Sequence, residues 1–274
     1  MTEMEIICIG NELLIGKTAN TNSQWLSKRA INLGVVVRRI TVVSDKVEEI
    51  AEAILEALNR KGSFIITTGG LGPTFDDKTL EGLARALNRR LQINQKALRM
   101  VKEKYKKYAQ EKRVDEYEMT QPRLKMATIP ENAIPLRNPG GTAPGVLVDL
   151  EETTIVALPG VPSEMMAIFE EAIAPLLKEA TDQNNFCEKS IYADQIMEST
   201  LAPLIDKVMR NNPHIYIKSH PKREENKPHI EIHFSTTTRS TEAPKKTIEK
   251  AVIQLSKLIN ESGGKVIANE YSDS

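Results

Sequence analysis

The sequence predicts an α/β protein in which a mainly parallel β-sheet is sandwiched between helices, followed by a second, smaller α+β domain. Two observations predict this class. In the first 180 residues, short apolar runs alternate with amphipathic stretches, which is the pattern of parallel strands joined by crossover helices. After the polar stretch 181–185, the pattern changes to pairs of strands between helices. We therefore expect one domain at 1–180 and another at 184–270.

The elements of the first domain follow from hydrophobic periodicity and from end signals. Asn22 or Ser23 can cap the first helix, and Asp45 with Glu48 three residues later has the form of a capping box. Five prolines between 120 and 145 predict an irregular segment that wraps around the domain. The expected strands are 5–9, 35–43, 63–67, 146–150 and 154–158; the expected helices have apolar stripes across 25–33, 50–58, 80–87 and 98–108, with a further helix at 162–178 bent at Pro175.

The second domain should contain strands near 189–192, 214–219, 229–235 and 265–268, with helices at 198–210 and 244–262. On the third of these strands, His229, Glu231 and His233 alternate and share one face. These three side chains are either a second metal site or an ordinary solvent face, and the lack of an evident fourth ligand favours the solvent face.

Composition excludes several classes of protein. Lys plus Arg number 37, and Asp plus Glu also number 37, so the chain has no excess of basic residues that would indicate nucleic-acid binding. The lysine-rich face of the helix around 98–108 is interpreted as a solvated surface. Cys8 and Cys187 form neither a disulfide framework nor a zinc spacing. No apolar run approaches the length of a membrane span, and the first residues lack the pattern of a signal peptide, so we expect a cytoplasmic protein.

The most informative stretch is Thr67–Asp77, which lies between an expected strand and an expected helix. Its glycines Gly69, Gly70 and Gly72 let backbone approach a ligand closely, and the free amides of a helix start favour an anion. Asp76 and Asp77 add the hard oxygen ligands of a divalent cation, so the stretch predicts a phosphate bridged by a metal ion. The alternative is that one aspartate only caps the helix.

Two common phosphate-binding motifs do not match this sequence. A Rossmann fingerprint needs its glycines directly after the first strand, but residues 10–16 lack that spacing. Lys78 and Thr79 stand in the register of a Walker A loop, but Asp77 replaces the glycine before the lysine and Pro73 removes one amide donor. Dinucleotide redox chemistry and a P-loop are therefore not expected.

Other polar or glycine-rich segments follow comparable strand ends. They are Glu12, the asparagines Asn20 and Asn22, the segment 138–145 with Gly140, Gly141 and Thr142, and the segment 158–164 with Gly160 and Ser163. Ligands of open α/β sheets bind beyond the carboxyl ends of the strands. These segments are therefore expected to form one composite site with the glycine loop, although each one alone is also typical of caps and turns.

Five motifs in order, namely Gly10–Leu14, Asn20–Asn22, Thr67–Asp77, Asn138–Gly145 and Leu158–Met165, closely resemble the molybdopterin-binding-like domain of the CinA (competence-damage-inducible protein A) family. The resemblance spans about residues 4–178, and the segment near 184–268 resembles the KH-like domain that follows in that family. It implies a three-layer α/β/α fold of the MogA/MoaB type, usually oligomeric. It also implies, for this branch, a metal-dependent pyrophosphatase acting on ADP-ribose and, in some relatives, on FAD. The chain ends before the family's nicotinamide-nucleotide amidase domain could begin, so amidase activity is not expected.

The resulting expectation is a hydrolase that cleaves the phosphoanhydride of a nucleoside diphosphate compound with a Mg, Co or Ni ion. Its partners would be that small molecule and further copies of the chain, which would form a homodimer or a higher homo-oligomer. No membrane binding is expected. Nucleic-acid binding is not expected either, because the small domain lacks a Gly-x-x-Gly loop. The catalytic and metal-binding residues would be Asp76, Asp77 and Glu12. The substrate-binding residues would be Gly69, Gly70, Gly72, Thr74, Asn20, Asn22, Gly140, Gly141, Thr142, Gly160 and Ser163.

Two other functions use the same loops. One is a non-catalytic protein that binds a nucleotide or molybdopterin without hydrolysis. The other is an enzyme like a molybdopterin adenylyltransferase, which would consume ATP in the presence of a pterin acceptor.

Overall fold

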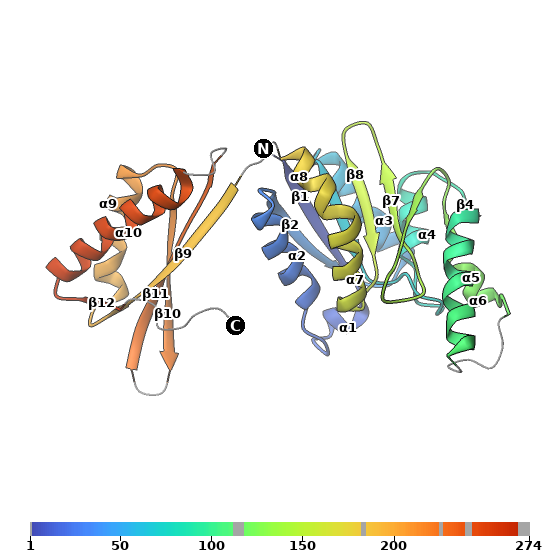
Figure 1. Cartoon of the computed structure of the whole chain (residues 1–274), viewed down its shortest axis with the longest axis horizontal. Coiled ribbons are helices and arrows are strands. Elements are labelled where there is room, and N and C mark those ends of the chain that lie inside the picture. The colour runs from blue at the N-terminus through green and yellow to red at the C-terminus, as the bar shows by residue number, and fades with distance from the viewer. Residues whose placement is uncertain (1, 112–117, 182–184, 225–226, 239–242, 268–274) are drawn as a thin grey trace. The chain divides into compact units, whose positions relative to one another are not determined.

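The computed structural model describes residues 2–111, 118–181, 185–224, 227–238 and 243–267. The chain forms two compact units, and the first consists of Met1–Ile31 and Val35–Thr181 (Figure 1). No helix in the described parts of the chain is long and apolar enough to cross a membrane.

A six-stranded sheet forms the centre of the first unit, in the order β2-β1-β3-β8-β7-β6. The first four of these strands are parallel, and β7 runs antiparallel to both of its neighbours. The sheet is therefore mainly parallel, as predicted. The strands are β1 (Glu3–Ile9), β2 (Val36–Val43), β3 (Phe64–Thr68), β6 (Ile134–Leu136), β7 (Gly145–Asp149) and β8 (Thr154–Leu158).

Helices cover both faces of this sheet, which explains why β3 is buried along its whole length and β1 is buried at every residue after Glu3. Ile7 and Ile9 of β1 pack into a core with Ile50 and Ile54. On the other face, the ring of Trp25 contacts Phe169 edge to face, with ring centroids 5.4 Å apart. Figure 1 shows α2, α7 and α8 on the near side of the sheet. The helices are α1 (Asn11–Leu14), α2 (Thr21–Asn32), α3 (Val47–Asn59), α4 (Thr79–Ala86), α5 (Gln95–Gln110), α6 (Gln121–Lys125), α7 (Pro162–Ile168), the π-helical η1 (Phe169–Ile173) and α8 (Ala174–Ala180).

The helix ends differ from the expected caps. Asn20, not Asn22 or Ser23, caps α2, because its side-chain oxygen accepts the backbone N–H of Ser23 at 3.2 Å. Asp45 forms no capping box with Glu48. Lys46 is the cap residue of α3 and makes no side-chain cap bond, while Asp45 accepts the backbone N–H of Asn11 at 2.8 Å. A short polar side chain before a helix has the same sequence pattern whether it caps the helix or bonds to a distant segment.

The proline-rich segment 120–145 holds three short elements instead of a continuous coil. They are α6, β5 (Thr128–Pro130) and β6, and β5 pairs antiparallel with β4 (Leu91–Ile93) as a separate two-stranded sheet. The helix expected at 162–178 is interrupted by the π-helical turn η1, which ends two residues before Pro175. Pro175 itself lies in the first turn of α8, where a proline is tolerated.

The second unit contains a four-stranded antiparallel sheet in the order β10-β11-β9-β12. Its core packs Ile232 and Phe234 of the central strand against Leu201 and Leu255 of the two helices. On the opposite face, the Glu231 carboxylate lies 3.2 Å from Lys222 and the His233 ring lies 3.5 Å from Glu188. The elements are β9 (Asn185–Asp194), α9 (Glu198–Asn211), β10 (Tyr216–Glu224), β11 (Lys227–Thr238), α10 (Ala243–Glu261) and β12 (Lys265–Ile267). A second, smaller α+β domain was expected, and this prediction is confirmed; the antiparallel arrangement of its sheet comes from the structure.

Packing of α4 against α3 leads to a first prediction. A Cβ atom added at Gly82 would lie 2.4 Å from Cγ2 of Ile50, in a fully buried contact between the two helices. Gly82→Ala should therefore lower the free energy of unfolding by about 1–3 kcal/mol through overpacking, although alanine is the better helix former. Urea denaturation measures the change. Gly62→Ala is the matched control, because its added Cβ would meet nothing closer than 3.9 Å. A variant at Gly82 that is as stable as the wild type would contradict this packing.

Candidate functional site

The carboxyl ends of the four parallel strands lie level with one another. Ile9 pairs with Val43, Cys8 pairs with Thr68, and Thr68 pairs with Leu158. The residues that follow these strands therefore share one edge of the sheet, where ligands of such sheets bind. Glu12, Asp45, the glycine loop and Gly160 all follow directly from these four ends.

The segment before β7 also lies at this edge, because β7 begins here, whereas the four parallel strands end here. Because β7 is antiparallel to β8, Val146 near its start pairs with Ala157 near the end of β8, and Gly145 pairs with Leu136 at the end of β6. The loop 137–144 thus connects β6 to β7 at this edge. The fold brings all five predicted segments to one side of the sheet.

Close backbone contacts explain the glycines of the loop after β3. Gly69 has a φ of 111°, and a Cβ there would lie 2.1 Å from the carbonyl oxygen of Ile9. Gly70 has a φ of 63°, and its missing Cβ leaves room for the hydroxyl of Thr79, which donates to the Gly69 carbonyl at 2.6 Å. The Gly69 N–H donates to the carbonyl of Leu158 at 3.0 Å. Gly69 therefore shapes the loop, and its amide is not free for a phosphate as the sequence had led us to expect.

A first pocket lies between α1, α2 and the ends of β1, β3 and β8. Asn22 fixes its walls, because its side-chain amide donates to the hydroxyl of Thr68 and to the carbonyl of Gly160, each at 2.9 Å. The side-chain oxygen of Asn22 is buried and has no partner. Five predicted residues line this pocket, together with others: Ile9, Glu12, Leu13, Thr18, Ala19, Asn20, Thr21, Asn22, Thr68, Gly69, Gly160 and Pro162.

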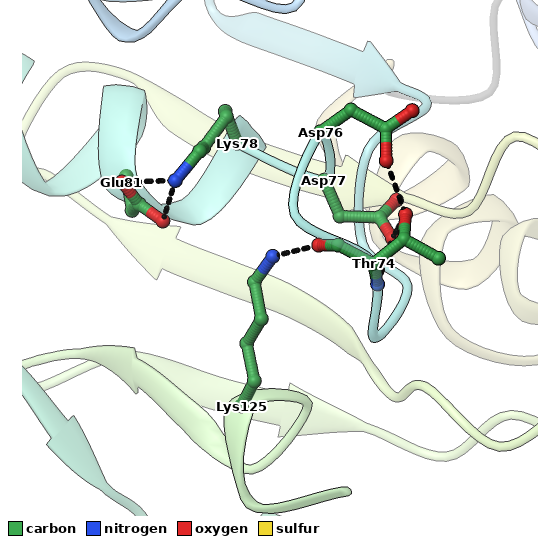
Figure 2. A network of polar contacts seen from close by, with 6 residues as sticks. All are labelled: Thr74, Asp76, Asp77, Lys78, Glu81 and Lys125. Carbon is green, nitrogen blue, oxygen red and sulfur yellow. Dashed lines mark hydrogen bonds and ion pairs between the residues drawn. The ribbon is translucent and has the colours of Figure 1, made fainter. Parts of the chain in front are cut away.

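The two predicted aspartates are both bound to Thr74 (Figure 2). The carboxylate of Asp77 accepts the Thr74 N–H at 2.7 Å and lies 2.6 Å from its hydroxyl, which also contacts Asp76. Lys125 donates to the Thr74 carbonyl from α6, and Lys78 pairs with Glu81 at 2.8 Å. The hydrogen bond from Thr74 holds the pKa of Asp76 below its ordinary value. Neither aspartate caps α4, whose cap residue Lys78 makes no side-chain capping bond.

Asp45 is a fourth carboxylate at this edge. Partial burial raises the pKa of Asp45 above its ordinary value, and the negative charges of Glu12, Asp76 and Asp77 raise it further, although the Asn11 N–H opposes the shift. Sequence reasoning interpreted Asp45 as part of a capping box. The signal that could have found it is its position directly after the second strand, at the same carboxyl edge as the other candidates.

These carboxylates do not converge on one point. The part of the chain that the structure describes contains no group of three or more His, Cys, Asp or Glu side chains that could hold a metal ion. Asp76, Asp77 and Glu12 therefore do not form the ligand set that was expected for a single ion. The described histidines of β11 likewise belong to no such group. Binding of a divalent cation by one or two carboxylates with ligand oxygens stays a prediction.

Five of the remaining predicted residues line two further pockets. Gly70, Gly72 and Asp77 line a second, mostly apolar pocket of about 410 Å³ with Leu71, Leu80, Glu81, Leu91, Ile93, Gln121, Leu124, Lys125 and Thr128. Gly141 and Thr142 line a third pocket, beside α5. Gly140 donates its N–H to Asn138 at 3.1 Å, and Ser163 is exposed in the first turn of α7. The expected single composite site is thus divided into neighbouring pockets along one edge.

Comparison with known proteins identifies the family. Residues 5–179, which contain the whole six-stranded sheet and its carboxyl edge, match the family model described as probable molybdopterin binding domain. The chain belongs to this family. A relative from Sulfurisphaera tokodaii is 44% identical over 264 residues, and the match covers 96% of this chain and 97% of the relative. Another, from Aeropyrum pernix, is 42% identical over 262 residues and covers 95% of each chain.

Solved structures extend the comparison. The protein CinA from Thermoplasma acidophilum, described as having unknown function, is 39% identical with a TM-score of 0.57, and the match covers 62% of this chain and 95% of that one. This match confirms the resemblance to CinA. A protein from Thermus thermophilus described as the molybdopterin biosynthesis enzyme MoaB is 17% identical with a TM-score of 0.43, covering 66% of this chain and 97% of that one.

The expectation of a metal-dependent pyrophosphatase acting on ADP-ribose or FAD is wrong. The family model that covers the predicted site is described by molybdopterin binding, and the similar CinA structure is described without a function. Cleavage of a diphosphate bond has no support in these matches. The alternative function, in which the same loops serve a molybdopterin-binding protein, fits the family better.

The carboxylates of the edge lead to a second prediction. Asp45→Asn keeps an oxygen that can accept the Asn11 N–H but removes one of four neighbouring negative charges. Because the folded-state pKa of Asp45 is raised, its ionised form costs stability, and this cost appears as the pH rises through that pKa. The melting temperature should rise by at least about 1 °C at pH 8 and stay unchanged below the ordinary carboxyl range, near pH 3.

Scanning calorimetry at the two pH values checks this expectation. Glu52→Gln, on the exposed side of α3, is the control for the loss of one negative charge. A variant at Asp45 that is less stable than the wild type at pH 8 would show that the carboxylate is needed for the fold.

Proposed function

We propose that the first unit binds a molybdopterin-type ligand, a flat pterin that carries a phosphate group, at the carboxyl edge of its sheet. The observation that carries this proposal is the family match over 5–179, because these residues include every segment of that edge. The proposal makes the chain a binding protein of molybdopterin metabolism, with or without a catalytic step.

Three features of the edge support a ligand with this chemistry. The first pocket has polar walls that include Asn20, Asn22 and Thr68, which suit the polar rim of a heterocycle. The second pocket offers apolar walls such as Leu71 and Leu91 for a ring face. Phe75, at the tip of the glycine loop, is 88% exposed and has no role in the core, so its ring is available for stacking.

Charge at the edge bears on how a phosphate is held. Asp45, Glu12, Asp76 and Asp77 repel a bare phosphate, so a group bound beside them requires a neutralising cation. We therefore keep a divalent ion such as Mg²⁺ in the proposal, shared between ligand oxygens and one or two of these carboxylates. Affinity for a phosphate held at this place should fall when divalent ions are removed with EDTA.

A second candidate function is transfer of an adenylyl group to the pterin. Consecutive residues of the Gly69–Gly72 stretch line the first and the second pocket, an arrangement that suits a nucleotide and a second ligand together. In that reaction a phosphate oxygen of molybdopterin attacks the α-phosphorus of ATP, and pyrophosphate leaves. Release of pyrophosphate that requires both ATP and molybdopterin would favour this enzyme over a binding protein.

Two earlier expectations belong to the same proposal, a cytoplasmic location and a homodimer or higher homo-oligomer. Light scattering after size-exclusion chromatography measures the oligomeric state. A protein that stays monomeric at working concentration with and without ligand would remove the oligomer from the proposal.

The binding proposal gives a third prediction. The purified chain should bind molybdopterin saturably under anaerobic conditions, measured by quenching of the fluorescence of Trp25. Asn22→Asp places a carboxylate against the Gly160 carbonyl and should weaken binding about tenfold or more, roughly 1.4 kcal/mol. Gln24→Ala, an exposed residue of the same helix, is the control. If molybdopterin fails to bind while AMP or ADP-ribose binds, the ligand is a nucleotide and the proposal is wrong.

A further inference from the structure

The third pocket has a basic lining that neither the fold nor the proposed function uses. We call it the basic pocket: it lies between α5 and the loop 137–144 and has a volume of about 360 Å³. Its lining consists of Met100, Glu103, Lys104, Lys107, Arg137, Asn138, Pro139, Gly141, Thr142 and Pro144. Part of the lysine-rich face of α5, which the sequence presents as a solvated surface, is therefore turned toward a concave loop.

Three cations face this pocket with one carboxylate, Glu103. Lys104 donates to the carbonyl of Pro139 at 2.6 Å, which fixes its ammonium group beside the loop. Burial lowers the pKa of Lys104, and the charges of Lys107 and Arg137 lower it further, although the carboxylates of Glu164 and Glu111 oppose the shift. Lys104 is therefore repelled by both of the other cations. An anion placed among them would relieve this repulsion.

Lys107 and Arg137 each form only a weak ion pair with a carboxylate. The carboxylate of Glu111 lies 3.7 Å from Lys107, and that of Glu171 lies 3.4 Å from Arg137, with all four side chains well exposed. Exposed ion pairs of this kind contribute little to stability, so a ligand that binds the cation better can easily replace the carboxylate. A phosphate offers three acceptor oxygens to both groups at once, and arginine can bind two of them together.

Hydrogen bonds of the Asn138 side chain hold the loop that forms the opposite wall. Asn138 is 5% exposed, accepts the N–H groups of Gly140 and Gly141, and donates to the carbonyl of Ala143 at 2.8 Å. It also donates to Glu164 at 2.6 Å, which keeps that carboxylate against the loop and occupied. The pocket is thus preorganised, and an anion can enter without first ordering the backbone.

We infer that the basic pocket is a binding site for a phosphate group of a small molecule. Lys107 and Arg137 contact the phosphate oxygens, Lys104 contributes its fixed charge, and the hydroxyl of Thr142 is an additional donor. This site is separate from the four carboxylates of the edge, so it needs no divalent cation. The inference does not depend on which ligand the first pocket takes.

Calorimetric titration of the full chain with inorganic phosphate and with pyrophosphate, in EDTA at low salt, tests the site. The wild type should bind saturably, and Lys107→Ala combined with Arg137→Ala should weaken binding at least about tenfold, which equals about 1.4 kcal/mol. Lys106→Ala, an exposed lysine of the same helix outside the pocket, should bind like the wild type. Unfolding curves of the variants verify that each one is folded.

Two results would overturn the inference: no saturable binding to the wild type, or equal affinity in the wild type and the double variant. A third variant separates this inference from the proposed function. Asn22→Asp alters the first pocket and should leave phosphate binding unchanged, and if it abolishes phosphate binding instead, the anion site lies in the first pocket and the inference fails. In the wild type, displacement of phosphate by molybdopterin would identify the group as part of that ligand, whereas additive binding would identify a separate phosphorylated molecule.

Discussion

The close approach of backbone at Gly69 is the constraint on which the rest of the site depends. The end of β1, the loop after β3 and the loop after β8 meet there, with the Ile9 carbonyl where a side chain would be and the Gly69 N–H bonded to Leu158. No residue with a Cβ fits this position without moving a strand end. The tight junction sets the level of the carboxyl edge, and it therefore places Asn22, Thr68 and Gly160 within bonding distance of one another.

The same junction explains why this glycine loop is not a phosphate cradle of the usual kind. A cradle needs free N–H groups, but at Gly69 the amide is used to join two strands, and the aspartates of the loop are tied to Thr74. The loop is stabilised from within and offers a ligand its shape, its carboxylates and the exposed ring of Phe75. Anion binding is then better served by the opposite end of the edge, where lysine and arginine gather beside Asn138.

Much of the fold was predictable from the sequence, because the alternation of apolar runs and amphipathic stretches reflects burial, which decides both the strands and the order of the layers. The short elements β4, β5 and α6 were not, since three to five residues carry no measurable period. The position of the candidate site was predictable from strand ends, but its division into pockets was not. That division depends on where α5 and α6 pack, and on whether a residue such as Asp45 caps its own helix or bonds to Asn11.

The electrostatics of the edge argue that it is a site and not only a structural feature. A fold gains nothing from holding four carboxylates near one another: burial is the main reason that the pKa of Asp45 is raised, and the charges of Glu12, Asp76 and Asp77 raise it further. Three cations also gather around one pocket at the same edge, and the charges of Lys107 and Arg137 add to burial in lowering the pKa of Lys104. Local arrangements that work against stability are typical of functional sites, where a ligand restores the balance of charge. Opposite charges at the two ends of one edge are suited to a ligand, or a pair of ligands, with differently charged parts.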